Sequence, residues 1–377
     1  MLRELFRVKD MKPIGIYLHV PFCKSKCDYC DFYSLVGKED LFEEYTKSLI
    51  TSLEKWGNTI LRRADTIYFG GGTPSLLSPS QIGRIIKAAN AAFPLTDDAE
   101  ITLECNPSTI YDGFFEQVAL HGVNRVSLGL QSADAGERAA LGRKATPQQA
   151  ELAVKMAQKS GISNISLDLM LALPGQTEKS LIHSVDFCES VGATHVSAYI
   201  LKPEDNTPFA KRVSEHPDED FAADMYLAAC NELESRGYMQ YEISNFCKAG
   251  FESRHNMKYW LCEEYLGLGP ASYSYIGGER MYYERDIDAF MRGAEPTFDA
   301  YGNDFEEFCM LRLRLADGLK SADTMDEYGK ALPEEMLQRA KALQKHGLVI
   351  CDEHSIRLTK NGFLVSNSVI TELLCGL

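Results

Sequence analysis

The chain has 377 residues, 45% of them hydrophobic and 25% charged, which is typical of a folded globular protein and excludes a disordered or collagen-like chain. The formal net charge of −15 argues against tight binding to nucleic acid or to an anionic membrane surface, because both favour a basic surface. We expect a cytoplasmic protein, because the start shows no signal sequence and no run could span a bilayer. In that reducing compartment the eleven cysteines are expected to form no disulfides. Met11 is a second candidate start.

Short runs rich in Ile, Val, Leu and Tyr recur through the first 200 residues, and longer amphipathic stretches separate them. Such runs are typical of strands buried on both faces of a parallel sheet. The expected strands are Gly15–Val20, Thr66–Phe69, Glu100–Glu104, Arg125–Leu130, Ile165–Leu171 and His195–Leu201. The expected helices between them are Leu41–Trp56, Pro79–Ala92, Gly113–His121, Pro147–Ser160 and Thr177–Val191. A strand about every 30 residues predicts repeated βα units, and hence an α/β fold with a partial (β/α)6 barrel.

The second half departs from this repeat. We expect a helix at Asp218–Arg236, an added strand at Tyr238–Phe246 and a linker near Gly293–Gly302. Beyond the linker the order helix, hairpin, helix resembles a winged-helix module. Its expected elements are Glu334–His346, Leu348–Asp352, Ser355–Leu358 and Asn361–Leu374. The expected domains are therefore a barrel with an extra strand and helix segment over 1–295 and a winged-helix-like domain over 302–377. Residues 301–377 include 12 acidic and 9 basic residues, which favours packing or interaction over DNA binding.

Three cysteines stand close together after the first expected strand, at Cys23, Cys27 and Cys30. Three thiolates within eight residues can bind one soft metal centre, and the neighbouring Lys24 and Lys26 favour the thiolate form. A structural zinc site normally has a fourth ligand and paired C-x2-C units, and no second pair follows here. Three thiolates suit a [4Fe–4S] cluster, because a cluster with only three protein ligands keeps one iron open to an external chelating ligand.

Further candidate residues lie where other expected strands end. The sequence Gly70-Gly-Gly-Thr-Pro74 follows the second strand, and its glycines let the backbone approach a ligand closely, although a tight turn is the commoner reason for them. Glu104 ends the third strand, where a carboxylate can accept hydrogen bonds from ribose hydroxyls. Asp168 lies in an apolar run and needs a partner or a ligand. With Gln131 and Arg143 it forms a candidate ligand set; the alternatives are an internal Asp–Arg pair and a surface Gln.

Four motifs resemble the radical S-adenosylmethionine (SAM) superfamily and, within it, the family of oxygen-independent coproporphyrinogen III dehydrogenase (HemN) and its heme-chaperone paralogue (HemW). They are Tyr17-x-His-x-Pro-Phe-Cys23, Gly70-Gly-Gly-Thr-Pro74, Gly129-Leu-Gln131-Ser and Leu173-Pro-Gly-Gln-Thr177. The resemblance covers Pro13 to Leu374. It implies a [4Fe–4S] cluster on Cys23, Cys27 and Cys30, whose open iron binds the amino and carboxylate groups of SAM. One electron from the cluster then breaks a C–S bond of SAM and gives a 5′-deoxyadenosyl radical. The contacts to the cluster-bound SAM that the resemblance implies are Tyr17, Gly71, Gly72, Thr73, Glu104 and Tyr273. The residues that match positions holding a second SAM in the dehydrogenase are Gln131, Arg143, Asp168 and Ile200, and Tyr29 would lie against the cluster and its SAM.

Two features resemble the heme chaperones more than the dehydrogenase. Phe32 stands where the dehydrogenase has a further Cys, and only 22 residues precede Cys23 where the dehydrogenase has a longer segment. The sequence His255-Asn-Met-Lys-Tyr-Trp260 is similar to the H-N-x-x-Y-W motif of the chaperones. A histidine can ligate heme iron, and the resemblance implies that role for His255. From the residues alone, a structural histidine beside a core Trp is the alternative.

The resemblance thus implies a chain that binds heme and transfers it to an acceptor protein, with the cluster and SAM gating transfer or supporting dimerisation. The alternatives are oxidative decarboxylation of coproporphyrinogen III and radical modification of RNA, and the acidic balance argues against the second. Whether the chain catalyses a reaction stays open at this point. We expect a monomer or a cluster-dependent homodimer without nucleic acid and without a membrane span, and a peripheral contact with a membrane heme protein stays open as well.

Overall fold

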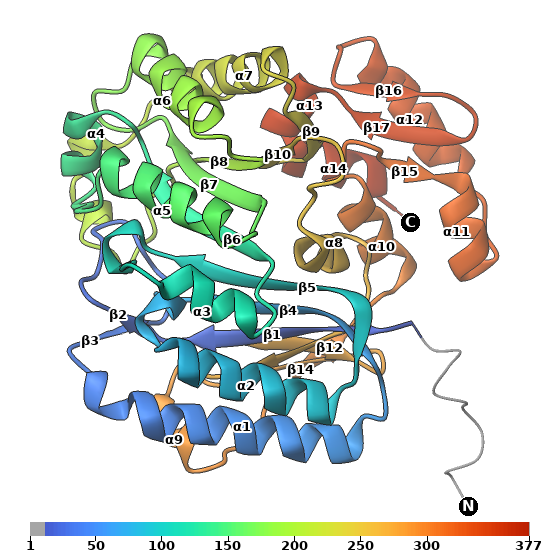
Figure 1. Cartoon of the computed structure of the whole chain (residues 1–377). Helices are drawn as coiled ribbons and strands as arrows, with labels where there is room; N and C mark the ends of the chain where they lie inside the picture. Colours follow the sequence, from blue (N-terminus) through green and yellow to red (C-terminus); the bar gives the residue numbers. More distant parts are fainter. Residues whose placement is uncertain (1–11, 377) are drawn as a thin grey trace, which may run out of the picture.

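The computed structural model describes residues 12–376, so the candidate start at Met11 lies outside it. Its centre is a row of six parallel strands that lie side by side in chain order (Figure 1). They are β1 (Ile14–Val20), β4 (Ala64–Gly71), β5 (Leu95–Cys105), β6 (Arg125–Gln131), β7 (Asn164–Leu171) and β8 (His195–Ile200). These strands overlap the six expected ones, so the predicted βα repeat is confirmed.

The barrel is open. At one end of the row β11 (Tyr265–Leu268) pairs in parallel with β1, and at the other end β10 (Asn245–Cys247) pairs antiparallel with β8. Within residues 12–376, β1 and β8 therefore do not pair with each other, and the whole sheet has twelve strands. The single added strand expected at Tyr238–Phe246 is a hairpin of β9 (Met239–Glu242) and β10.

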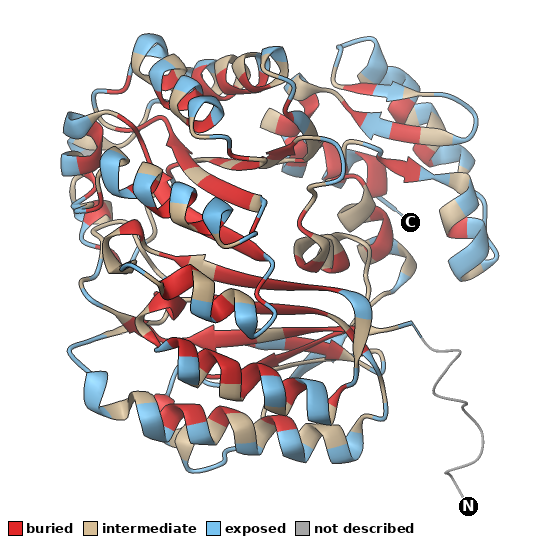
Figure 2. Cartoon of the chain, viewed as in Figure 1, coloured by how far each residue is buried: buried red, intermediate tan, exposed pale blue. Residues whose placement is uncertain are grey.

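Helices cover the outer face of the strands, and Figure 2 shows that they bury the side turned toward the sheet. They are α1 (Phe42–Thr59), α2 (Pro79–Ala92), α3 (Phe114–Leu120), α4 (Ala135–Ala140), α5 (Pro147–Lys159) and α6 (Glu178–Ser190). Ser78 and Gln81 form a capping box at the start of α2, which satisfies main-chain N–H groups that have no partner inside the helix. Gly161, with a φ of 84°, follows α5 and lets the chain leave the helix.

The two faces of the parallel strands differ in polarity. In β6, the side chains of Val126 and Leu128 pack in the apolar core, whereas Ser127 and Gln131 line a cavity. A closed barrel of this type usually fills its interior with branched apolar side chains. Here the inner face is polar, which leaves an interior suited to a ligand with many hydrogen-bonding groups.

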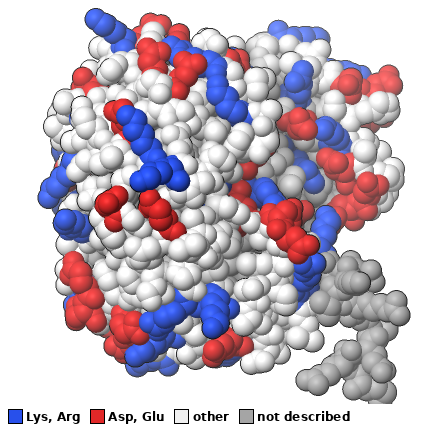
Figure 3. Space-filling view, viewed as in Figure 1, with Lys and Arg blue, Asp and Glu red and all other residues white. Residues whose placement is uncertain are grey.

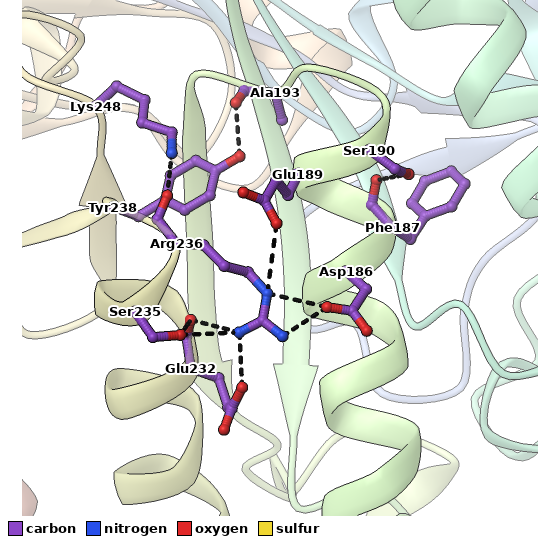
Figure 4. Close-up of polar contacts among 10 residues, drawn as sticks. All are labelled: Asp186, Phe187, Glu189, Ser190, Ala193, Glu232, Ser235, Arg236, Tyr238 and Lys248. Carbon is purple, nitrogen blue, oxygen red and sulfur yellow. Dashed lines mark hydrogen bonds and ion pairs between the residues drawn. The ribbon is translucent and has the colours of Figure 1, made fainter.

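An arginine network fixes α7 (Glu219–Ser235) beside α6 and β8 (Figure 4). The Arg236 guanidinium lies 2.5 Å from Asp186 and 3.6 Å from Glu189 on α6, and 2.6 Å from Glu232 on α7. Tyr238 donates a hydrogen bond of 2.7 Å to the carbonyl of Ala193 just before β8. These contacts hold the outer helices in place at the last strand of the row.

A strand replaces the linker expected near Gly293–Gly302. β14 (Thr297–Tyr301) pairs antiparallel with β13 (Glu279–Tyr282), which pairs in turn with β12 (Tyr273–Ile276) at the edge beyond β11. The short helix α9 (Ile287–Met291) lies between β13 and β14 in the chain. The linker prediction was wrong because all five residues of β14 are exposed, so the strand lacks the buried apolar positions by which a strand is recognised.

The expected helix–hairpin–helix order is present at the end of the chain. Its elements are α10 (Phe305–Arg312), β15 (Leu319–Lys320), α11 (Ser321–Tyr328), α12 (Glu334–Gln344), β16 (Val349–Cys351), β17 (Ser355–Leu358), α13 (Lys360–Leu364) and α14 (Ser366–Leu374). The single helix expected at Asn361–Leu374 is interrupted at Val365, which has a φ of −113°. This part packs directly on the barrel: Ala316 donates a main-chain hydrogen bond of 3.0 Å to Tyr241, and Lys360 lies 2.6 Å from Glu234 on α7.

The surface shows no broad basic area on the face that Figure 3 presents, where Lys and Arg are interspersed with Asp and Glu. This agrees with the acidic balance of the chain. In the part of the chain from 12 to 376, no helix combines the length and the apolar character needed to cross a membrane.

Candidate functional site

A cavity of about 680 Å³ lies at the carboxyl ends of the parallel strands, where ligands of α/β proteins usually bind. Its lining comes mainly from the loop after β1 and from β4 to β8, with one residue each from β10 and from the helix over 254–260. Twelve of the fifteen residues that the sequence predicted for the site line this cavity. They are Cys23, Cys27, Tyr29, Cys30, Gly71, Gly72, Thr73, Glu104, Gln131, Arg143, Asp168 and Ile200. A second cavity of about 480 Å³ beside α10 and α11 is lined by none of the predicted residues.

The three clustered cysteines are free thiols on one loop. Cys23 lies in the short strand β2 (Phe22–Cys23), which pairs with β3 (Leu35–Val36) and so closes the loop at both ends. Thr73 Oγ1 lies 3.6 Å from Cys23 Sγ, and Arg143 Nη1 lies 3.8 Å from Cys27 Sγ, so each sulfur faces a hydrogen-bond donor. Donors and a positive charge at these distances stabilise a thiolate.

The thiols fit an iron–sulfur cluster by their chemistry, although they are not already gathered around one point. Among the described residues, no three His, Cys, Asp or Glu side chains have the arrangement of a metal site. The three thiols are nevertheless soft donors on one loop that line one cavity, and burial raises the pKa of Cys30 above its usual value. A bound metal centre would offset that penalty, because it is the thiolate that ligates metal.

A fourth thiol, which the sequence analysis did not single out, also lines the cavity. Cys105 ends β5, is 5% exposed and directs its Sγ toward the carbonyl of Leu103 at 3.6 Å. Burial raises its pKa well above the usual range of a thiol. Cys105 therefore stays protonated, and it lies outside the cysteine loop.

Two buried carboxyl groups face the cavity from neighbouring strands. Glu104 accepts hydrogen bonds from the Tyr68 hydroxyl at 2.8 Å and from the Gly71 main-chain N–H at 3.2 Å. Burial raises the pKa of Glu104 to about 7. Asp168 accepts a hydrogen bond from Ser127 Oγ at 3.1 Å, and burial raises its pKa to about 6. Both groups thus titrate near neutral pH, where each can accept or donate a hydrogen bond.

Gln131 is not a surface glutamine, and Arg143 does not form an internal pair with Asp168, so neither alternative holds. Gln131 is 5% exposed, so it is not a surface residue, and its φ of 71° is uncommon for a residue other than glycine. The Tyr199 hydroxyl donates to Gln131 Oε1 at 3.5 Å. Arg143 donates to the Gly129 carbonyl at 2.6 Å and to Cys27, rather than pairing with Asp168. A strained backbone such as that of Gln131 is often found at ligand sites.

The glycine turn after β4 serves two purposes. Gly71 has a φ of 106°, and a Cβ there would lie 2.6 Å from the His19 ring. A Cβ on Gly72 would lie 2.6 Å from the carbonyl oxygen of Phe22, directly before Cys23. The turn therefore packs against the start of the cysteine loop, and no larger residue fits. Both glycines also line the cavity, so the tight turn and the close approach to a ligand are compatible.

Three predicted residues lie outside the cavity lining: Tyr17, Tyr273 and His255. Tyr17 directs its hydroxyl toward His19 Nδ1 at 3.2 Å. Tyr273 is 51% exposed at the sheet edge and packs against Tyr282. The arrangement of the cavity gives no support to SAM contacts by Tyr17 and Tyr273, which stay predictions.

His255 is fully buried in α8 (Arg254–Trp260). Its Nδ1 lies 2.7 Å from Thr66 Oγ1 and its Nε2 lies 2.8 Å from the Tyr259 hydroxyl, so both ring nitrogens are engaged. Burial lowers the pKa of His255 to about 3, which keeps the ring neutral. This is the environment of a core histidine, so heme ligation stays a prediction that requires α8 to move. Lys258, on the same helix, is also buried and lies 2.9 Å from Asp65.

Several residues of the lining come from inner strand positions or from distant segments and were not predicted from the sequence. They include Tyr68, Ser127, Ser197, Tyr199, Asn245 and Asn256. Tyr68 and Ser127 belong to strands that read as continuous apolar runs, so no local pattern marks them. Asn256 follows His255 directly, and only the position of α8 across the strands brings it to the cavity.

Comparisons with known proteins show the family to which the chain belongs. Residues 17–188 match the model of the radical SAM superfamily, and residues 303–365 match that of the HemN C-terminal domain. The chain is 34% identical to heme chaperone HemW of Bacillus subtilis (strain 168) over 95% of this chain and 98% of that protein. It is 32% identical to heme chaperone HemW of Escherichia coli (strain K12) over 96% and 98% of the two chains.

A solved structure confirms the fold. The radical SAM enzyme coproporphyrinogen III oxidase (HemN) from Escherichia coli superimposes with a TM-score of 0.84 over 97% of this chain and 91% of that one, at 20% identity. The predicted partial barrel and the small C-terminal domain are thus those of this fold. From its identity with several named relatives over nearly their whole length, the chain belongs to the HemW heme-chaperone family of the radical SAM superfamily.

Proposed function

We propose that this chain binds a [4Fe–4S] cluster and SAM in the cavity, binds heme, and passes the heme to an acceptor protein. The observation that carries the proposal is the cavity itself. It brings three free thiols of one loop together with two buried carboxyl groups and a glycine turn, in a chain whose relatives are named heme chaperones. We further propose that the chain works in the cytoplasm, as a monomer or as a cluster-dependent homodimer.

Cys23, Cys27 and Cys30 would hold the cluster. A [4Fe–4S] cluster with three protein thiolates supplies one iron that can bind a chelating ligand and pass an electron to it. Thr73 and Arg143 would donate hydrogen bonds to the sulfurs of Cys23 and Cys27, and the guanidinium would offset their negative charge. Glu104, ionised or protonated near neutral pH, would take part in hydrogen bonds with the hydroxyl groups of the SAM ribose.

Phe32 supports a chaperone rather than a porphyrinogen dehydrogenase. It stands where the dehydrogenase has a further cysteine, and its side chain is 67% exposed at the edge of the cavity. An exposed phenyl ring cannot ligate a metal, but it offers apolar surface at the mouth of the site. The solved structure of coproporphyrinogen III oxidase (HemN) shares only 20% identity with this chain, so the similarity supports the fold and no activity.

Heme ligation by His255 is the part of the proposal that needs a conformational change. The imidazole must leave Thr66 and Tyr259 before a nitrogen can face iron. The helix that carries it is only seven residues long, and the side chain of Glu100 holds its first turn by accepting from the N–H groups of Arg254 and His255. Release of α8 would break these hydrogen bonds, the buried ion pair of Lys258 with Asp65 and the ion pair of Arg254 with Asp98.

A heme titration tests this assignment. We expect the His255→Ala variant to bind heme at least about tenfold more weakly than the wild type, with a reduced Soret band, because the iron loses its axial ligand. The matched control is His183→Ala, since His183 is exposed on α6. If His255→Ala and wild type give the same Soret intensity and affinity, His255 is not the ligand.

A further inference from the structure

His255 lies directly behind the wall of the cavity. Its ring stacks on that of Tyr68, with ring centroids 5.2 Å apart and an interplanar angle of 29°. It also stacks on Tyr17, with centroids 6.3 Å apart and an angle of 28°. Tyr68 lines the cavity, whereas His255 does not. One aromatic ring therefore separates the imidazole from the ligand space.

Tyr68 is one of two groups that hold Glu104. The carboxyl group accepts from the Tyr68 hydroxyl at 2.8 Å and from the Gly71 N–H at 3.2 Å. A buried carboxyl group that loses one of two donors is less well oriented and less stable, because each hydrogen bond fixes the direction of an oxygen and offsets part of the cost of burying it. The direction in which Glu104 faces the cavity thus depends on where the Tyr68 ring lies.

His255 is itself held in one orientation. A neutral imidazole has one donor and one acceptor, and the hydroxyls of Thr66 and Tyr259 can complement both. The main-chain N–H of His255 is bound to Glu100 at 3.2 Å. Gly15 on β1 leaves the room that the ring needs, since a Cβ at that position would lie 3.1 Å from His255 Cε1. The ring is therefore a fixed support and not a loosely packed filler.

We infer that His255 is a positioning residue for the carboxyl group of Glu104, on which it acts through the ring of Tyr68. The inference rests on the proposed function only in that SAM binds in this cavity, and it does not depend on heme. His255 touches no atom of the ligand. When the imidazole leaves its place, Tyr68 loses the nearer of its two stacked neighbours and keeps only Tyr17, whose ring centroid lies 6.1 Å away at an angle of 26°. Glu104 then loses the orientation that suits SAM.

The test is a double-mutant cycle on SAM affinity, measured by equilibrium binding to protein with a reconstituted cluster. We expect His255→Ala and Tyr68→Phe each to weaken SAM binding by about tenfold. If His255 acts through the Tyr68 hydroxyl, the SAM affinity of the double variant is at most about twofold below that of the single variant with the lower SAM affinity. Effects that multiply in the double variant, or an unchanged affinity in His255→Ala, would overturn the inference.

His195 provides the matched control. It is also fully buried in the barrel, with Nδ1 2.8 Å from Ser166 Oγ and Nε2 2.8 Å from the Tyr241 hydroxyl, but it does not stack on Tyr68. His195→Ala should keep the SAM affinity within about twofold of the wild type. An equal loss of SAM affinity in both variants would mean that truncating any buried histidine of the barrel loosens the site, and the inference would fail.

A second variant separates this role from heme ligation. His255→Phe keeps a ring against both Tyr17 and Tyr68 but has no nitrogen, so SAM affinity should recover to within about threefold of the wild type while axial ligation of heme is lost. If His255→Phe binds SAM as weakly as His255→Ala, stacking is not the cause. If His255→Ala weakens SAM binding and leaves heme binding unchanged, the positioning role holds and the proposed heme ligand fails.

Discussion

A Cys27→Ala variant purified without oxygen should retain less than about a tenth of the iron of the wild type and should lack its brown colour. Cys27 is the middle cysteine of the loop, and its sulfur faces the guanidinium of Arg143 at 3.8 Å. With two thiolates left, the loop can no longer hold a cubane cluster that needs three protein ligands. Iron analysis and the visible absorption spectrum measure the loss.

The sharpest control is Cys105→Ala, because Cys105 lines the same cavity but lies outside the loop. Its thiol is buried and protonated, so the variant should keep the iron content and colour of the wild type. Full iron retention in Cys27→Ala would contradict the ligand assignment. Loss of iron in Cys105→Ala would show a fourth thiolate on the cluster and would remove the open iron on which the proposal depends.

A Glu242→Gln variant should gain stability relative to the wild type as the pH rises. Glu242 is 1% exposed where β9 meets the C-terminal part of the chain, and burial raises its pKa to about 7. In the unfolded chain the group titrates near 4.5. The folded protein is therefore favoured while Glu242 is protonated, and this advantage is lost as the pH rises from about 4.5 through 7.

The expected size of the effect follows from the shift. Glutamine cannot ionise, so the variant escapes the penalty, and its stability relative to the wild type should be about 1–3 kcal/mol higher at pH 8 than at pH 5. Urea unfolding at both pH values measures the difference. Glu353→Gln, an exposed position at the tip of the hairpin of β16 and β17, should show no such change. A Glu242→Gln effect that is equal at both pH values would contradict the raised pKa.

The six parallel strands could be predicted because each has a central stretch that is buried on both faces and therefore reads as a short apolar run. The helices could be predicted because capping residues and glycines mark their ends, as at Ser78 for α2. The strand β14 gave no such signal, since it is held by main-chain hydrogen bonds at the sheet edge and all its side chains are exposed. Elements with buried apolar positions or capping residues can thus be predicted from the sequence, whereas an exposed edge strand cannot.

The site was predictable where residues end strands and less so where they lie within them. The ends of parallel strands meet at one edge of the sheet, so Glu104 and the glycines after β4 reach the same cavity. Asp168 lies within β7 and could be predicted only because a carboxyl group in an apolar run needs a partner or a ligand. Tyr68 stands inside an apolar run, and its role depends on the neighbouring strand that carries Glu104. The motif singles out His255, but it does not show whether the ring faces the cavity or lies behind the cavity wall. Only the position of α8 against Thr66 on β4 shows that the ring lies behind the cavity wall.

The central claim is that three thiols of one loop hold a cluster with an iron that SAM can chelate. The measurement that tests it most directly is electron paramagnetic resonance of the reconstituted, reduced protein with and without SAM. Our account predicts that SAM shifts the g values of the cluster, because the ligands of one iron change. A spectrum that stays the same at saturating SAM would contradict the account.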